Sequence, residues 1–223
     1  MNVKRESQLV GVILASFVFL PPDVTYGGEL TGHIVGKPLL AEGSRHRPVI
    51  WVEGAEGAAV PMVSTVITHL SGKLEPAVSI GYVGRDFVFR NDDQEFHNTH
   101  LCLHLEYQKR TSRRPLHYGA TIYNVPLPAG GNEIRKPIKP YHRYRKETGH
   151  IEVVCNPHPG EKAYVMVFDH PYCDVAGEDG SFSITGVPPG RYPVLVLFEG
   201  EVREAGEAVV LEGEATVLDL NLD

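Results

Sequence analysis

Residues 150–168 read HIEVVCNPHPGEKAYVMVF, and this stretch decides the fold. Two runs of mainly β-branched and other apolar residues, 150–155 and 163–168, flank a connection rich in proline and glycine. β-branched residues favour strands, whereas proline and glycine favour tight turns. The stretch therefore predicts two consecutive strands, with Cys155 at the end of the first strand and His158 in the turn.

The same pattern recurs along most of the chain. Similar runs lie at 28–35, 48–54, 63–70, 77–83, 85–91 and 191–198. With 23 glycines and 17 prolines, long helices are not expected. Many short strands at this spacing indicate an all-β protein, built as an antiparallel sandwich or barrel.

Composition excludes several classes of protein. The 223 residues are 42% apolar and carry a net charge of −7, which fits a folded chain with a sizeable core. The mild acidity argues against nucleic-acid binding by the whole chain. Residues 109–146 nevertheless hold ten basic residues against one acid, whereas 147–223 hold three against fifteen. The basic segment is either a docking face for an acidic partner, polysaccharide or anionic lipid, or a solvated loop.

The N-terminus has the pattern of an export signal. Lys4 and Arg5 precede an apolar run at 9–20, and two prolines end that run. A basic start with a short apolar centre is typical of a secretory signal, which we place at residues 1–27. The alternative is an uncleaved anchor, and no later run is apolar enough to span a membrane. We expect a periplasmic or extracellular protein, whose thiols face oxidising conditions.

One set of side chains is suited to binding a metal ion. Cys155 and His158 lie in one strand connection, and His97 follows another predicted strand. A thiolate with two imidazoles is the donor set of blue-copper sites. From the residues alone, a C-x-x-H pair also fits zinc, or a buried cysteine beside a surface histidine.

Three stretches resemble a known family: GRDFVFRNDDQEFHNTHL at 84–101, VVCNPHPGEKAYVMVFDHPY at 153–172 and EDGSFSITGVPPGRY at 178–192. They resemble exported cupredoxin-like proteins of the plastocyanin and azurin group that carry a carboxypeptidase-regulatory-like segment, some of them called methylamine-utilisation proteins. The resemblance implies a Greek-key sandwich with additional prealbumin-like strands at the C-terminus. It also implies copper held by His97, Cys155 and His158, with Asn91 and Asn98 locking the ligand loops.

The sequence departs from that family at one ligand position. In the relatives the motif usually continues as C-x-x-H-P-W-M, with methionine as the axial ligand, whereas Gly160 and Glu161 stand here. Glu161 can serve as an axial oxygen ligand of copper, or it can complete a Cys-His₂-Glu set for zinc. The third outcome is that metal binding has been lost. Met166 lies within a predicted strand, where packing is expected.

Three of the remaining candidates lie in one predicted strand. His100, Cys102 and His104 alternate along it and share a face, which is either a second metal site or, as we favour, a place from which His100 supports the first site. Cys102 and Cys173 either form a disulfide or stay as two buried thiols.

No catalytic residues are expected, because G-x-S-x-G, H-E-x-x-H and P-loop motifs do not occur in the sequence. We expect a cupredoxin-like domain at 28–172 and a regulatory-like segment at 173–223, which can pack with the N-terminal strands. The first hypothesis is an exported copper protein that carries single electrons or holds copper, with a redox partner at 109–146. The alternative is an exported β-sandwich interaction module, metal-free or stabilised by zinc.

Overall fold

The computed structural model describes residues 27–36, 45–105, 120–140 and 149–222. The predicted signal, except for its last residue, and seven of the ten basic residues of segment 109–146 lie outside these ranges. Strands are the regular elements of the described residues, which contain no helix, so the all-β prediction is confirmed. In particular, this part of the chain has no helix long and apolar enough to cross a membrane.

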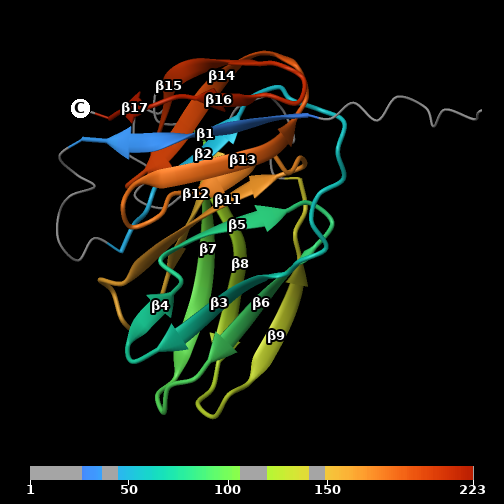
Figure 1. The fold of residues 1–223 in the computed structure, drawn as a ribbon. Coiled ribbons are helices and arrows are strands. Elements are labelled where there is room, and N and C mark those ends of the chain that lie inside the picture. The colour runs from blue at the N-terminus through green and yellow to red at the C-terminus, as the bar shows by residue number, and fades with distance from the viewer. Residues whose placement is uncertain (1–26, 37–44, 106–119, 141–148, 223) are drawn as a thin grey trace, which may run out of the picture.

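Two sheets form a sandwich in the middle of the chain (Figure 1). The five-stranded sheet has the order β5 (Val78–Tyr82), β11 (Lys162–Phe168), β10 (Gly149–Val154), β7 (His97–Leu105) and β8 (Ala120–Leu127). The four-stranded sheet has the order β4 (Lys73–Glu75), β3 (Thr65–Leu70), β6 (Asp86–Asn91) and β9 (Glu133–Pro137).

Alternating side chains build the core between these sheets. In β3, every second residue is buried, starting with Thr65 and ending with His69. Phe87 and Phe89 of β6 and Leu101 of β7 are fully buried in this core. Burial of each such side chain stabilises the fold by roughly 1.5–3 kcal/mol, so the interior face of the sandwich is strongly specified.

Within the sandwich, the pairing differs from the expected antiparallel arrangement in two places. β3 runs parallel to β6, and β5 runs parallel to β11. Parallel neighbours need a crossover connection, and both connections here pass through the other sheet. The chain leaves β3, passes through β4 and β5, and returns to β6. The residue pattern within each strand does not reveal that the chain passes from one sheet to the other and back.

A second unit is built from both ends of the described chain. One of its sheets contains β1 (Gly28–Val35), β13 (Ser181–Val187), β16 (Ala215–Val217) and β17 (Leu220–Asn221). The other contains β12 (Cys173–Val175), β2 (Val49–Val52), β14 (Gly190–Phe198) and β15 (Glu201–Val210). β1 and β2 therefore pair with C-terminal strands, and the sandwich begins at residue 65 rather than at residue 28.

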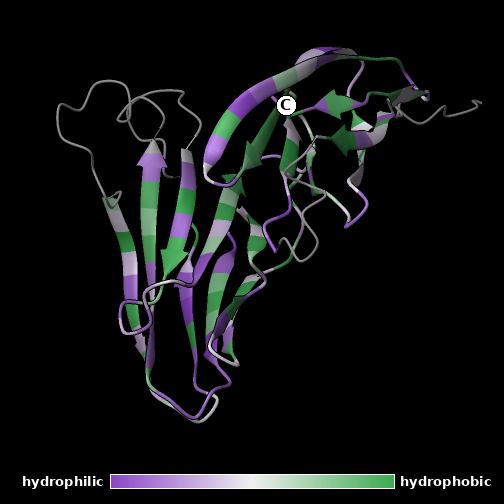
Figure 2. Cartoon of the chain, turned by 90° about the vertical axis from the view of Figure 1, so that its left-hand side faces the viewer, coloured by the Kyte–Doolittle hydropathy of each residue, from purple (hydrophilic) through white to green (hydrophobic). Residues whose placement is uncertain are grey.

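A shared apolar cluster joins the sandwich to the second unit. Trp51 of β2 packs on Phe168 of β11, with ring centroids 5.5 Å apart. Met166 and Leu197 are buried in the same cluster. Figure 2 shows apolar residues alternating with polar ones along the strands of both units. Met166 thus lies at this junction as a packing residue.

Candidate metal centre

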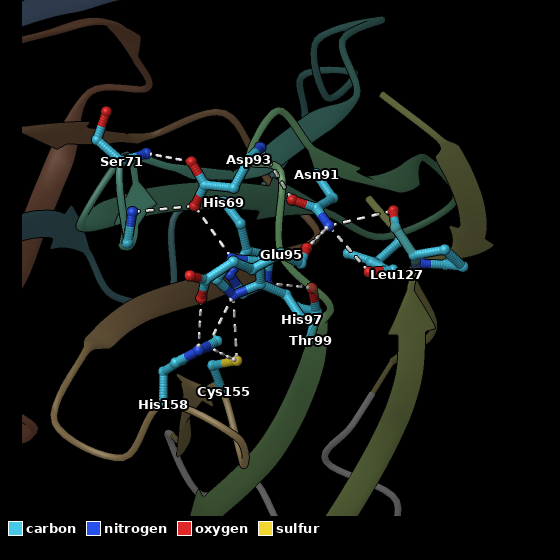
Figure 3. Close-up of polar contacts among 12 residues, drawn as sticks. His69, Ser71, Asn91, Asp93, Glu95, His97, Thr99, Leu127, Cys155 and His158 are labelled. Carbon is cyan, nitrogen blue, oxygen red and sulfur yellow. Dashed lines mark hydrogen bonds and ion pairs between the residues drawn. The ribbon is translucent and has the colours of Figure 1, made fainter. Parts of the chain in front are cut away.

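Three side chains singled out from the sequence meet at one end of the sandwich, where the β6–β7 loop approaches the β10–β11 turn (Figure 3). His97 is the first residue of β7, Cys155 follows directly after β10, and His158 lies in the turn. Strand pairing brings these segments together, because β10 runs antiparallel to β7 with Val154 opposite His100.

The donor atoms of these residues form a small triangle. Nδ1 of His97 lies 3.1 Å from Nδ1 of His158. Sγ of Cys155 lies 3.5 Å from the first nitrogen and 3.6 Å from the second. The centre of such a triangle is about 2 Å from each atom, close to the usual length of a metal–nitrogen bond. The spacing therefore fits a bound metal ion without rearrangement of the loops.

Burial differs among the three donors. His97 and Cys155 are each 2% exposed, whereas the side chain of His158 is 37% exposed. Two donors are thus shielded by the sandwich, and the third lies at the surface. The centre therefore has one defined edge that faces solvent.

Asparagine side chains fasten the two loops. Oδ1 of Asn98 accepts a 2.7 Å hydrogen bond from the backbone N–H of Asn156, next to Cys155. The buried Asn91 amide donates to the carbonyls of Glu95 and Leu127. Both asparagines therefore lie where they can hold the ligand loops in place.

His100 lies outside the triangle of donor atoms. Its Nε2 is 2.9 Å from Oγ1 of Thr121, and its Nδ1 is 3.3 Å from Oδ1 of Asn156. His100 thus contacts the residue that follows Cys155, and it is placed to support the ligand turn rather than to bind a metal ion.

Carboxylates contact the outer nitrogens of both histidines. Oδ2 of Asp93 lies 3.0 Å from Nε2 of His97, and Oε2 of Glu95 lies 3.2 Å from Nε2 of His158. Burial alone raises the pKa of Asp93, but hydrogen bonds from the N–H groups of Gly72 and Ser71 and the charge of His97 give a net lowering. Asp93 is therefore ionised at neutral pH.

His69 is a donor that sequence reasoning missed. Its ring stacks on that of His97 at a centroid distance of 4.4 Å, and a nitrogen of His69 lies within 4.8 Å of the donor atoms of His97 and Cys155. Burial, with the nearby charge of His97, lowers its pKa to about 4, so the ring is neutral at pH 7. Nε2 of His69 lies 3.0 Å from Oγ1 of Thr99. One sequence feature could have identified His69: it occupies a position that faces inward in the alternating strand at 65–70.

Glu161 has a different partner from the expected one. Its Oε2 lies 2.8 Å from Nη1 of Arg45, and Arg45 also contacts Glu75 and the carbonyl of Leu74. Among the described residues, the group of donors whose ligand atoms lie within 4.8 Å of one another contains His69, His97 and Cys155, and it includes neither His158 nor Glu161. The structure therefore gives Glu161 a role in fastening the turn to β4.

The other two cysteines are far apart in the fold. Cys102 lies in β7 of the sandwich and Cys173 in β12 of the second unit, and both are free thiols. The disulfide weighed from the sequence is not found in the structure. Sγ of Cys173 is 3.6 Å from the hydroxyl of Tyr82, and burial raises the pKa of this thiol to about 12.

The face shared by Cys102 and His104 carries a second polar cluster. The rings of His104 and His150 stack at 5.1 Å with an interplanar angle of 6°. Nε2 of His104 contacts Glu152 at 3.0 Å, and Lys162 contacts the same carboxylate. Nε2 of His104 is thus directed at Glu152, and the group of His, Cys and carboxylate donors that the described residues bring together for a metal ion contains neither His104 nor His150.

Comparisons with known proteins find only distant structural similarities. No protein-family model and no curated protein matches the chain. A purple cupredoxin from Nitrosopumilus maritimus has 19% identity and a TM-score of 0.33, covering 47% of this chain and 99% of that one. Two amicyanin mutants in the Cu(I) form have 16% identity and TM-scores of 0.33 and 0.34, covering 53% of this chain and 98% of theirs. Identities and TM-scores this low carry no argument about a ligand or an activity of this chain.

Proposed function

We propose that the chain is an exported copper-binding protein of the cupredoxin type, which carries single electrons or holds copper. The observation that carries the proposal is the triangle formed by His97, Cys155 and His158, with sides of 3.1–3.6 Å. A soft thiolate with two imidazoles in a trigonal arrangement suits copper. The proposal therefore rests on the chemistry and spacing of the donors in this chain.

The protein residues would supply a fixed and shielded setting. The hydrogen bond between Asn98 and Asn156 keeps the two ligand loops in register, so little movement accompanies a change of charge at the centre. Copper, when bound, supplies one-electron chemistry between Cu(II) and Cu(I). The electron would come from a partner protein with a one-electron centre and pass to a second one, with no bond made or broken in this chain.

Electron exchange would take place at the solvent-facing edge of His158. A recess beside the ligand turn is lined by uncharged residues, namely Phe96, Asn98, Asn124, Pro126, Asn156 and Pro157. Phe96 is 52% exposed. A neutral surface costs little to desolvate, so we place the contact with the redox partner here. The basic segment 109–146 would steer an acidic partner toward the molecule.

The proposal also covers where the protein is located and what the second unit does. The basic start and apolar run at residues 4–20 support export to the periplasm or the extracellular space. Strands β1, β2 and β12–β17 would form the regulatory-like unit, which serves as a scaffold rather than as a catalyst.

The decisive experiment compares two cysteine variants. Wild type, Cys155→Ser and Cys102→Ser are purified without metal and titrated with Cu(II), and visible absorption and EPR spectra are recorded. We expect an intense thiolate-to-copper band in wild type and Cys102→Ser, and none in Cys155→Ser. Cys102 is a matched control because it is an equally buried thiol of the same sheet. A wild type without a Cys155-dependent band contradicts the proposal.

Zinc is the second candidate, and His69 is the observation that favours it. A nitrogen of His69 lies within 4.8 Å of the donor atoms of His97 and Cys155. Together with His158, these residues would supply four donors, the number that zinc prefers. Zinc retained through purification and lost in His69→Ala would support this candidate. Copper binding that is unchanged in His69→Ala would oppose it.

A further inference from the structure

The two histidines of the metal centre have outer nitrogens in very different surroundings. If Nδ1 of each ring binds the metal, Nε2 carries the proton and faces a carboxylate. For His97 that carboxylate is Asp93, at 3.0 Å with 15% of its side chain exposed. For His158 it is Glu95, at 3.2 Å with 75% exposed.

The Asp93 carboxylate is held from several sides. The backbone N–H groups of Ser71 and Gly72, in the β3–β4 turn, donate hydrogen bonds of 2.5 and 2.9 Å to its two oxygens. The N–H of Asp93 itself donates to Oδ1 of the buried Asn91. A continuous chain of contacts therefore runs from the β3–β4 turn through Asp93 to His97 (Figure 3).

Among the described residues, no backbone N–H group holds the Glu95 carboxylate in this way. It reaches His158 from an exposed position, where water and salt screen its charge. A negative charge in a shielded site acts more strongly on a neighbouring cation than one in solvent. The two contacts therefore have similar lengths and unequal strength.

We propose that Asp93 is a positioning residue, which fixes the ring orientation and tautomer of His97 and thereby favours the doubly charged metal ion. This inference rests on the proposed copper site. Removing Asp93 would weaken Cu(II) binding more than Cu(I) binding, and so would raise the reduction potential. Glu95 would have the same effect on His158 only weakly.

The test uses three variants of the full chain that each remove one negative charge: Asp93→Asn, Glu95→Gln and Asp92→Asn. Asp92 is the matched control, because it neighbours Asp93 but pairs with Arg90 instead of a histidine. Cu(II) affinity is measured by competition titration, and the reduction potential by spectroscopic titration. Thermal unfolding of the metal-free variants shows that each is folded.

We expect Asp93→Asn to weaken Cu(II) binding about 10- to 100-fold, the usual effect of losing a carboxylate behind a ligand histidine. Each tenfold loss for Cu(II) relative to Cu(I) raises the potential by about 59 mV. Glu95→Gln and Asp92→Asn should change the affinity less than about threefold. Equal effects of Asp93→Asn and Asp92→Asn would overturn the inference.

A second measurement does not depend on a folded variant or on bound copper. In metal-free wild type at pH 8, ¹⁵N NMR should show His97 protonated on Nε2. Protonation on Nδ1 would overturn the role of Asp93 even if copper binds. Absence of a Cys155-dependent copper band in wild type would instead refute the copper site itself, so the two failures are distinguishable.

Discussion

Strands β7 and β10 carry two clusters of histidine and carboxylate, and only one of them is arranged to bind a metal ion. At the site end, Nδ1 atoms of His97 and His158 lie 3.1 Å apart beside a thiol. Further along the same strands, the rings of His104 and His150 lie parallel at 5.1 Å. Residue types are therefore similar in the two places, but the directions of the nitrogen atoms differ.

A cation already occupies the second cluster. The ammonium of Lys162 and the ring of His104 both contact Glu152, which lies 9% exposed on the outer face of the sheet. In the metal centre, by contrast, the carboxylates contact the outer nitrogens and leave the inner ones facing one another. Paired histidines and acids thus indicate a metal site only when the inner nitrogens share a centre.

A pair of alanine variants tests most directly whether only one of the two clusters binds a metal ion. His97→Ala should weaken Cu(II) binding by more than about 100-fold, because it removes a donor, whereas His104→Ala should change it less than about threefold. Competition titration measures both values. Similar losses in the two variants would mean that copper binds at the second cluster or at both.

The second cluster should make the unfolding free energy depend on pH below pH 4.5. The hydrogen bond from His104, with the contact from Lys162, outweighs burial and lowers the pKa of Glu152 to about 2, below its ordinary value of 4.5. A lowered pKa stabilises the fold above pH 4.5, and this contribution is lost as the pH falls toward 2. It amounts to at most about 3 kcal/mol of unfolding free energy.

Urea unfolding of the metal-free protein between pH 5 and 2 measures this contribution. Glu152→Gln should flatten the pH dependence, whereas Glu95→Gln, at an exposed position, should leave it intact. A wild-type curve that is flat below pH 4.5 would contradict the assignment.

A second pH-dependent contribution to the unfolding free energy comes from His69 in the metal centre, and it acts at higher pH. Burial lowers the pKa of His69 from 6.5 to about 4, so the unfolded chain gains a proton there before the folded chain does. The corresponding stability is present above pH 6.5 and is lost as the pH falls to 4, and it amounts to at most about 3 kcal/mol. NMR of the metal-free protein should find His69 neutral at pH 5.5, and an apparent pKa above 6 would refute this.

The smallest effect is expected at Glu161. Because its carboxylate is held in an ion pair with Arg45, Glu161→Gln should change Cu(II) affinity less than about twofold and leave the visible band in place. Titration together with an absorption spectrum checks this. A large shift of the band would restore Glu161 as an axial ligand.

Much of the centre could be predicted from local sequence. Cys155 and His158 share one strand connection, so proline, glycine and β-branched residues were enough to place these two side chains together. The assignment of His97 to the same centre came from family resemblance, and the pairing of β7 with β10 brings it there. The all-β class followed from the same signals. Asn91 and Asn98 came from family resemblance rather than from physical reasoning.

What could not be predicted depends on contacts between distant segments. His69 is 28 positions before His97 in the sequence, and only the parallel pairing of β3 with β6 brings it to the site. Arg45 removes Glu161 from the centre through an ion pair across 116 residues. The acids at 92–95 look like a solvated cluster in sequence, because the turn that holds Asp93 lies in another strand pair.

The interlocked ends of the chain have a mechanical consequence. β1 pairs in parallel with both β16 and β17, and the sandwich is inserted between the strands of that unit. A pull on the leading end of β1 and the trailing end of β17 loads these hydrogen bonds together, in shear, instead of opening them one at a time. The tension passes through the second unit and bypasses residues 65–168, so the metal centre is isolated from force applied at the ends of the described chain.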